Sequence, residues 1–103
     1  MPSLSFSKDA EQDLRQIFRY TKQKWGLKQA TKYKESLKLR LHKITTSVIK
    51  DKQLSTNLPD IFLSKAEFHH IYYLRLNPSE IIVIAILSPK QDTLAHLKLR
   101  TKL

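Results

Sequence analysis

The sequence contains no cysteine and only one glycine among its 103 residues. Without cysteine it can form neither a disulfide nor a thiolate metal site, and it has no cysteine nucleophile. With one glycine it has no glycine-rich loop of the kind that cradles phosphate groups. Its longest apolar run, residues 81–87, is far shorter than the ~20 residues that span a bilayer, and its first residues do not resemble a secretory signal. We therefore expect a soluble, cytoplasmic protein that needs no cofactor.

Acidic residues are also scarce, since 9 of them face 19 lysines and arginines, for a net charge of +10. The length and the 41% apolar content are typical of one globular domain spanning residues 1–103. Such a charge attracts polyanions, so nucleic acid and acidic proteins are the candidate partners. The cations are clustered, which favours a partner over simple solubility. They gather in two groups: Lys28, Lys32, Lys34, Lys38, Arg40 and Lys43, and then Lys98, Arg100 and Lys102.

Apolar residues at spacings of three and four predict two amphipathic helices, one from Ala10 to Trp25 and one from Leu27 to Val48. Ser7 stands where a helix N-cap is expected. Gly26, the only glycine, falls between the two patterns, where a helix often ends in a left-handed residue. The pattern therefore predicts an antiparallel hairpin of two helices with almost no connecting loop.

The rest of the chain has the features of strands. We expect a short first strand at residues 4–6, a loop from Asp51 to Asp60, and three later strands. These fall at Ile61–Leu63, Glu67–Leu76 and Ile81–Leu87, with a turn at residues 77–80. The predicted fold class is α+β: an N-terminal strand, an antiparallel two-helix hairpin, and then a three-stranded antiparallel sheet.

The segment Ile81–Leu87 is apolar at every position, which is typical of a central strand covered on both faces. A two-helix hairpin can cover only one face of a small sheet. Either the carboxyl-terminal segment folds across the other face, or another chain does. An apolar face left open and rimmed by lysines would be a binding surface.

Few residues offer catalytic chemistry. His69 and His70 are adjacent and point to opposite faces of a strand, so they cannot share a metal ion, and we expect no metal site. Four cationic or imidazole side chains could stabilise a phosphate or cleave RNA; solvated charges and hydrogen-bonded core histidines are the commoner reading of such residues. They are His70, Arg75, Lys90 and His96.

The order of these elements resembles the ParE branch of the RelE/ParE toxins of bacterial toxin–antitoxin pairs, over nearly the whole chain. The first helix carries Ala10-x-x-Asp13-Leu14-x-x-Ile17-x-x-Tyr20, and Trp25-Gly26 with Ala30 and Tyr33 resembles the family's hairpin. The segments with the most specific resemblance are His69-His70-Ile71-Tyr72-Tyr73, then Glu80 to Leu87, then Asp92 and His96-Leu97.

This resemblance implies a toxin that binds and poisons DNA gyrase, without catalysis of its own, and that an acidic antitoxin neutralises. The antitoxin would contact the outer face of the helical hairpin and the open sheet face. The chain departs from the family pattern at Ser88-Pro89-Lys90, where a histidine and an arginine are common. We expect partner contacts at Trp25, His70, Tyr72, Arg75, Lys90, Lys98 and Arg100.

The alternative is the RelE branch, which cleaves messenger RNA on the ribosome. By position its catalytic residues would be His70, Lys90 and His96, but the basic pair of the preceding strand would fall near Ile61 and Leu63, which are apolar. A third class, a plain nucleic-acid-binding module, lacks an evident aromatic stacking platform in the sequence.

Overall fold

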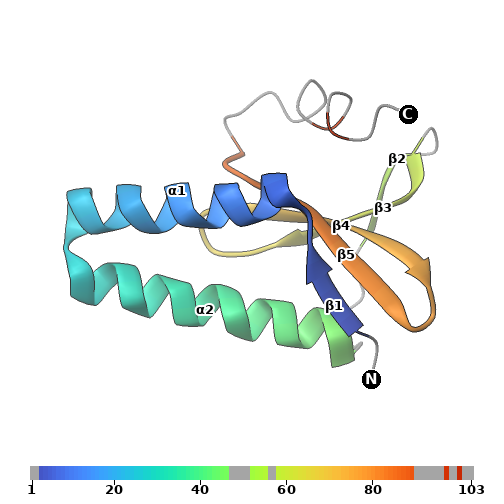
Figure 1. Ribbon diagram of the computed structural model, residues 1–103, viewed down its shortest axis with the longest axis horizontal. Coiled ribbons are helices and arrows are strands. Elements are labelled where there is room, and N and C mark those ends of the chain that lie inside the picture. The colour runs from blue at the N-terminus through green and yellow to red at the C-terminus, as the bar shows by residue number, and fades with distance from the viewer. Residues whose placement is uncertain (1–2, 47–51, 56–57, 90–96, 98–99, 101–103) are drawn as a thin grey trace.

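The computed structural model describes residues 3–46, 52–55, 58–89, 97 and 100. The helices pair as a hairpin that extends away from a twisted sheet (Figure 1). This is the predicted α+β order of a strand, two helices and further strands. The elements are β1 (Ser3–Phe6), α1 (Lys8–Trp25), α2 (Leu27–Thr46), β2 (Lys52–Ser55), β3 (Leu58–Lys65), β4 (His70–Asn77) and β5 (Glu80–Leu87).

Two residues set the boundaries of the first helix, Ser7 at its start and Gly26 at the turn into the second helix. The Ser7 hydroxyl accepts a hydrogen bond from the backbone N–H of Ala10 at 3.1 Å, which confirms it as the N-cap of α1. Gly26 has φ 93° and ψ 168°, a conformation that is essentially restricted to glycine. Its N–H donates to the carbonyl of Lys22 at 2.9 Å, and its own carbonyl accepts from Ala30 at 3.1 Å. One residue therefore ends α1 and begins α2.

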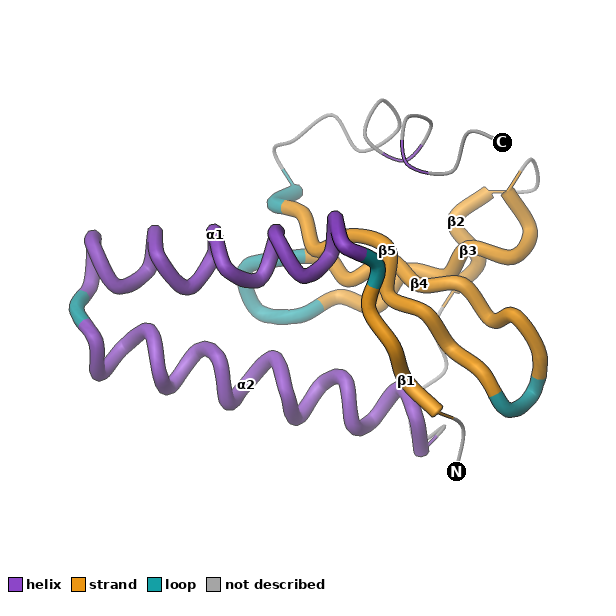
Figure 2. Tube along the Cα trace, viewed as in Figure 1, coloured by secondary structure: helices purple, strands orange, loops and turns teal. Residues whose placement is uncertain are grey.

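The five strands form one mixed sheet in the order β1-β5-β4-β3-β2 (Figure 2). Strand β1 pairs in parallel with β5, and the other neighbours are antiparallel. The predicted loop over Asp51–Asp60 is wrong, because β2 and the start of β3 lie within it. Strand β4 begins at His70 and not at Glu67, because the N–H of Ala66 bonds the carbonyl of His69 at 2.9 Å and closes a turn before it.

The helical hairpin covers one face of the sheet. Apolar side chains of α2 meet the inward side chains of β4 and β5, where Ile71, Tyr73 and Val83 are at most 1% exposed. Each fully buried aliphatic side chain of this kind contributes about 1.5–3 kcal/mol relative to exposure. The spacing pattern predicted the helical residues of this core, which are Ala10, Ala30, Tyr33, Leu37, Leu41 and Ile44.

The opposite face of the sheet is not left open. Leu97 is fully buried and packs in a second apolar cluster with Tyr72, Ile84 and Ala85. Of the two ways to cover this face, the structure shows the first, in which a residue of the carboxyl-terminal segment lies across it. The expectation of an uncovered face is corrected accordingly. As predicted, β5 is central and apolar on both faces.

A β-bulge in β5 allows both faces to be filled. Tyr72 pairs with Ala85 and Tyr73 with Val83, so Ile84 has no partner in β4. The extra residue shifts the alternation, and the neighbours Ile84 and Ala85 both join the second cluster. The carbonyl of Ile84 accepts hydrogen bonds from the side chains of Ser7 and Arg100, at 3.4 and 3.1 Å.

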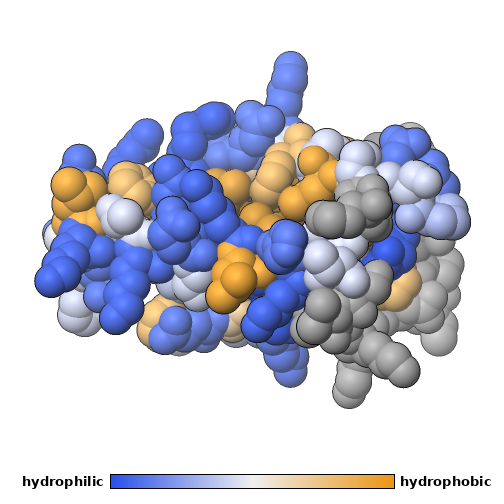
Figure 3. Space-filling model, turned by 90° about the horizontal axis from the view of Figure 1, so that it is seen from below, coloured by the Kyte–Doolittle hydropathy of each residue, from blue (hydrophilic) through white to orange (hydrophobic). Residues whose placement is uncertain are grey.

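Neither described helix is long and apolar enough to cross a membrane. Seen from below, the surface is mostly hydrophilic, with separate apolar patches (Figure 3). This agrees with the lysines expected on the polar side of the second helix, of which Lys28 and Lys32 are exposed.

Candidate functional site

Two hollows lie on opposite sides of the helical hairpin. The first, which we call the basic groove, has a volume of about 850 Å³ and lies between α1, α2 and the adjacent strand β1. Its floor is apolar because both helices and β1 direct buried or half-buried apolar residues into it. That floor includes Phe6, Leu14, Phe18, Leu37 and Leu41.

Cations line both edges of the basic groove. Arg15, Arg19 and Lys22 follow one another along α1 at helical spacing, and Lys34 and Lys38 follow along α2. Among the described residues that line the groove, none is acidic. Two of these cations form exposed ion pairs, Arg15 with Glu11 at 4.0 Å and Lys38 with Glu35 at 3.7 Å. Exposed pairs of this kind contribute little energy and can be exchanged for a partner's carboxylates. The groove therefore combines an apolar floor with a positive rim.

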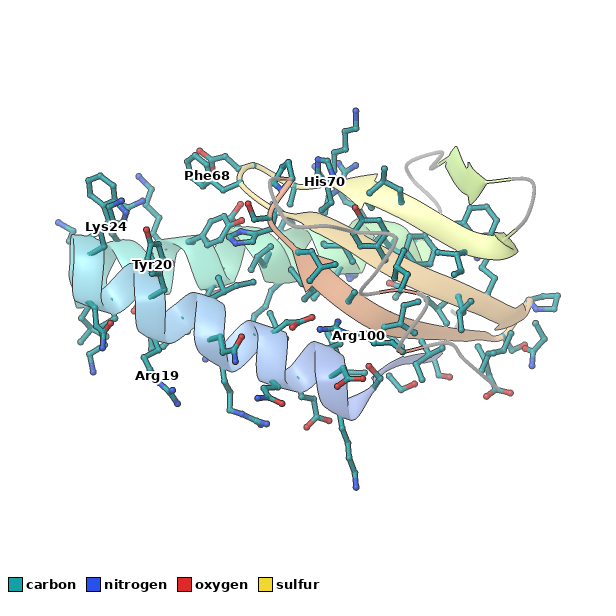
Figure 4. The ribbon with its side chains drawn as sticks, turned by 90° about the horizontal axis from the view of Figure 1, so that it is seen from above. Arg19, Tyr20, Lys24, Phe68, His70 and Arg100 are labelled. Carbon is teal, nitrogen blue, oxygen red and sulfur yellow. The ribbon has the colours of Figure 1, made fainter. Side chains whose placement is uncertain are left out.

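The second hollow, the aromatic cleft, has a volume of about 900 Å³ and lies on the side of the hairpin that faces the β3–β4 loop. Figure 4 views the hairpin from above, with Arg19 pointing to one side and Tyr20, Lys24 and Phe68 on the other. Tyr20, Trp25 and Phe68 line this cleft and are 59–65% exposed. The hairpin thus separates a basic surface from an aromatic one.

A hydrogen-bonded triad holds the β3–β4 loop against α2. The Tyr33 hydroxyl accepts from the backbone N–H of Phe68 at 3.3 Å and lies 2.7 Å from His69 Nδ1. The Phe68 N–H occupies one acceptor position of the hydroxyl, and the hydrogen bond between the hydroxyl and Nδ1 takes its direction from the His69 tautomer. Burial lowers the pKa of His69 and raises the pKa of Tyr33 to about 12, which keeps both groups neutral.

A buried ion pair ties α1 to the carboxyl-terminal segment. Asp13, whose side chain is 10% exposed, accepts from Arg100 at 2.7 and 3.0 Å and from the N–H of Ile86 at 2.9 Å. The Arg100 guanidinium also donates to the carbonyl of Ile84 at 3.1 Å, the residue of the bulge. Its hydrogen bond with Asp13 raises the pKa of Arg100 above its ordinary value. The pair keeps Arg100 beside the core.

The structure separates the residues expected to contact partners. Trp25 is 65% exposed and lines the aromatic cleft. His70 is half-buried, with its ring edge-on to Tyr72 at 6.4 Å. Tyr72 is 3% exposed, so its side chain is not at the surface as we expected. Arg75 lies over the rings of Phe62 and Tyr73, 5.8 Å from each centroid. These side chains do not form one site.

The expectation for Arg100 is corrected in the same way. Its side chain is 15% exposed, and Asp13 holds it within the chain instead of leaving it on a free arm. Lys90, His96 and Lys98 lie outside the described residues. Of the three catalytic residues of the RNase alternative, only His70 is therefore described.

The α1 side of the basic groove was not predicted from the sequence. Its signal is the recurrence of Arg15, Arg19 and Lys22 at intervals of four and three. The role of Asp13 was not predicted either, because its partner Arg100 is 87 residues away. Within the described part of the chain, no three histidine or acidic side chains gather as a metal ion would need.

Comparisons with known proteins give a consistent picture. Residues 4–93 match the model of the family described as the ParE toxin of type II toxin–antitoxin systems, parDE. The chain is 28% identical over 102 residues to a protein named Toxin ParE from Escherichia coli, with 99% of each chain covered. It also resembles a solved structure of the chromosomal ParDE TA system from P. aeruginosa. That match has a TM-score of 0.70 and 19% identity, and it covers 85% of this chain and 96% of the other. At this identity, the structural similarity concerns the fold.

Proposed function

The chain belongs to the ParE family of toxins of type II toxin–antitoxin systems, and from this we propose that it poisons DNA gyrase and that an acidic antitoxin neutralises it. Family membership supports the choice of target. The geometry of the basic groove supports the nature of the neutralising partner, and it is the observation on which the proposal chiefly rests.

The basic groove suits an amphipathic helix with acidic flanks. An apolar stripe at spacings of three and four would fill the floor between α1 and α2. Carboxylates beside that stripe would face Arg15 and Arg19 on one edge and Lys38 on the other. An acidic segment can remain unfolded on its own and fold when it reaches such a groove. The ParD antitoxin of this toxin would provide this segment.

The groove is tested by removing its charge. In the triple variant Arg15→Gln, Arg19→Gln and Lys22→Gln, we expect the affinity for the antitoxin to fall at least about ten-fold by calorimetry, since several charge pairs of about 0.5 kcal/mol or more are lost. The matched control removes the same charge elsewhere, through Lys8→Gln, Lys28→Gln and Lys32→Gln, all at exposed positions that do not line the groove. Equal losses in the two variants would show that only the net charge matters, and no loss in either would remove the groove from the interface.

The target is tested with purified components. Added to gyrase and supercoiled plasmid, the toxin should cause cleaved plasmid to accumulate, and its expression should induce the DNA-damage response. The antitoxin should suppress both effects. If gyrase is unaffected while ribosome-bound message is cut, the RelE-type activity is the correct one, and His70→Ala should then reduce the cutting. Poisoning through protein binding needs no catalytic side chain, so His70→Ala should affect gyrase poisoning only as far as His70 contributes to binding.

A further inference from the structure

The aromatic cleft has no role in the function proposed above. Its exposed rings come from α1 and from the β3–β4 loop, and Tyr20, Trp25 and Phe68 are each more than half exposed. Large aromatic side chains bury 150–250 Å² each when they are covered, so leaving three of them in water around one cleft forfeits a large stabilisation. Such clustering marks a binding surface.

A lysine is integrated into the aromatic surface. The Nζ atom of Lys24 lies 5.6 Å from the ring centroid of Tyr20 and 5.6 Å from that of Trp25, and it donates to the Tyr20 hydroxyl at 3.2 Å. Both distances are within the range of a cation–π interaction. The side chain therefore holds the two rings near a positive charge, so that an anionic group and a flat ring could be bound side by side.

The opposite wall of the cleft is held in place before any ligand arrives. Phe68 is fixed by the hydrogen bond from its N–H to the Tyr33 hydroxyl, and its ring lies 5.5 Å from that of Tyr33. Between the walls, Gln16 and Gln29 offer amides that can both donate and accept hydrogen bonds. Because the loop is already ordered, little conformational entropy would be lost on binding, which favours affinity.

The cleft presents no free negative charge among its described lining residues. Asp13 is their only carboxylate, and Arg100 neutralises it through two hydrogen bonds. The whole chain carries a net charge of +10. This charge attracts a polyanion to the molecule, and Lys24 provides the positive charge beside the rings of Tyr20 and Trp25.

We propose that the aromatic cleft binds unpaired bases of single-stranded nucleic acid, with Lys24 near the phosphates. Every base has a π face, so aromatic side chains can stack with bases whatever their sequence, and amides can meet the base edges. No stacking platform was evident in the sequence, because only the fold brings Phe68 to the same cleft as Tyr20 and Trp25. An acidic protein segment would be drawn instead to the basic groove, which has more cations and an apolar floor. The proposal does not depend on gyrase being the target.

The only tryptophan of the chain, Trp25, provides the measurement, since its fluorescence reports on the cleft itself. Titration of the purified protein with a thymidine oligonucleotide of about 15 nucleotides should quench this fluorescence to saturation. A DNA duplex of the same length should quench little, because its bases are stacked inside. A polyglutamate peptide should also quench little, because it offers charge without rings. Affinity should fall as salt rises.

Matched variants separate stacking from general attraction. Tyr20→Ala and Phe68→Ala should each weaken oligonucleotide binding about 5- to 100-fold. Leu39→Ala and Leu76→Ala remove side chains that are equally exposed, 57% and 58%, outside the cleft, and should change it less than about two-fold. Lys24→Gln should reduce the salt slope by about one, whereas Lys38→Gln in the basic groove should not. Circular dichroism checks that each variant is folded.

Three results would overturn the proposal. The first is an absence of quenching at low salt, and the second is equal quenching by the duplex or by polyglutamate. The third is an equal loss in the cleft variants and the leucine controls. If oligonucleotides fail while gyrase or the antitoxin changes Trp25 fluorescence, the cleft is a protein-docking surface and the nucleic-acid proposal is wrong. None of these results affects the gyrase assay, so the two proposals fail separately.

Discussion

At the scale of single residues, Gly26 shows how one position sets the geometry of the hairpin. Its φ and ψ of 93° and 168° lie outside the regions that side-chain-bearing residues adopt. A methyl group added there would meet no atom within 4 Å, so space does not restrict the position. The requirement for glycine is therefore conformational, and it can be measured apart from packing.

We expect Gly26→Ala to lower the free energy of unfolding by about 1–3 kcal/mol, the cost of holding a non-glycine residue in that region. Urea denaturation followed by circular dichroism measures the change. The control is Gln23→Ala, an exposed position within α1, which should change it by less than about 0.5 kcal/mol. A Gly26→Ala protein as stable as the wild type would mean that the hairpin can close in another conformation.

Asp13 is a second residue with a role larger than its size. It lies on the first helix at a position that looks like the polar edge of an amphipathic pattern, yet its side chain is 10% exposed and meets Arg100 and the backbone of β5. A buried charge that loses its partner is strongly destabilising, even where the intact pair contributes little.

We therefore expect Asp13→Asn to destabilise the fold by roughly 2–4 kcal/mol, between the cost of an unsatisfied hydrogen-bonding group and that of a broken buried ion pair. Asparagine keeps an oxygen for the N–H of Ile86, so the loss reports mainly on Arg100. In a double-mutant cycle, Asp13→Asn combined with Arg100→Gln should cost at least about 1 kcal/mol less than the two single losses together. Strict additivity would show that the two side chains are not coupled.

At the scale of elements, the β3–β4 loop depends on a neutral histidine. His69 shares a hydrogen bond of 2.7 Å with the Tyr33 hydroxyl, and burial lowers its pKa below the ordinary value of 6.5, although the charge of Asp13 acts in the opposite direction. Protonation would place a positive charge on a ring that is partly removed from water, which disfavours the folded conformation of the loop. His70 also has a lowered pKa, through burial and the charge of Lys65.

Because their pKa values are lowered, His69 and His70 bind protons less readily in the folded state than in the unfolded state. The contribution of the neutral histidines to the free energy of unfolding is therefore fully present above pH 6.5 and is lost as the pH falls below it. We expect urea unfolding between about pH 7.5 and pH 5 to show this decline. His69→Gln should flatten it more than His70→Gln, because only His69 fixes the loop. An unchanged slope in His69→Gln would place the pH dependence on other groups.

The sequence was enough to predict the elements whose pattern is local. Apolar spacing, Ser7 and Gly26 specify the two helices, and the uninterrupted Ile81–Leu87 run indicates a buried central strand. Strand β2 could not be predicted in this way, because the mostly polar residues Lys52–Ser55 become a strand only by pairing with β3. Its hydrogen bonds come from a partner strand, and intrinsic strand preference is weak.

The candidate site was less predictable, because its parts lie far apart in the chain. The lysines of the second helix were visible as a cluster, but the groove exists only where they face Arg15, Arg19 and Lys22 across the hairpin. Trp25 follows the apolar spacing of α1 and yet is 65% exposed, since the tip of the hairpin extends away from the sheet. Local periodicity describes a helix face, but it does not tell how far the neighbouring sheet extends.

At the scale of the whole molecule, part of the positive charge is concentrated on one side of the helical hairpin. The net charge of +10 includes two rows of cations on one side of the hairpin, and the aromatic rings lie on the other. Charges on an interface rim act mainly on the rate of encounter and on the choice of partner. The chain can in this way attract an acidic antitoxin rapidly while apolar contacts in the groove retain it.

We expect the association rate constant with the antitoxin to fall at least about ten-fold between 0.05 and 0.5 M salt, because the Debye length shrinks toward the size of a contact. The dissociation rate should change much less, since buried apolar contacts are not screened. Stopped-flow mixing and chase experiments measure the two rates. A salt effect confined to dissociation would indicate that the cations act within the bound complex instead of during encounter.

The pairing of β1 with β5 has a consequence for folding during synthesis. The Ser7 hydroxyl, directly after β1, donates to the carbonyl of Ile84, 77 residues later, and among the described strands β5 is the only neighbour of β1. During synthesis the helical hairpin can form early from local contacts, but the sheet cannot close until β5 has been made. A long loop must also be ordered at that step. In a nascent chain, Phe6 of β1 is therefore not yet packed into the floor of the basic groove. The surface proposed to bind the antitoxin is complete only late in folding.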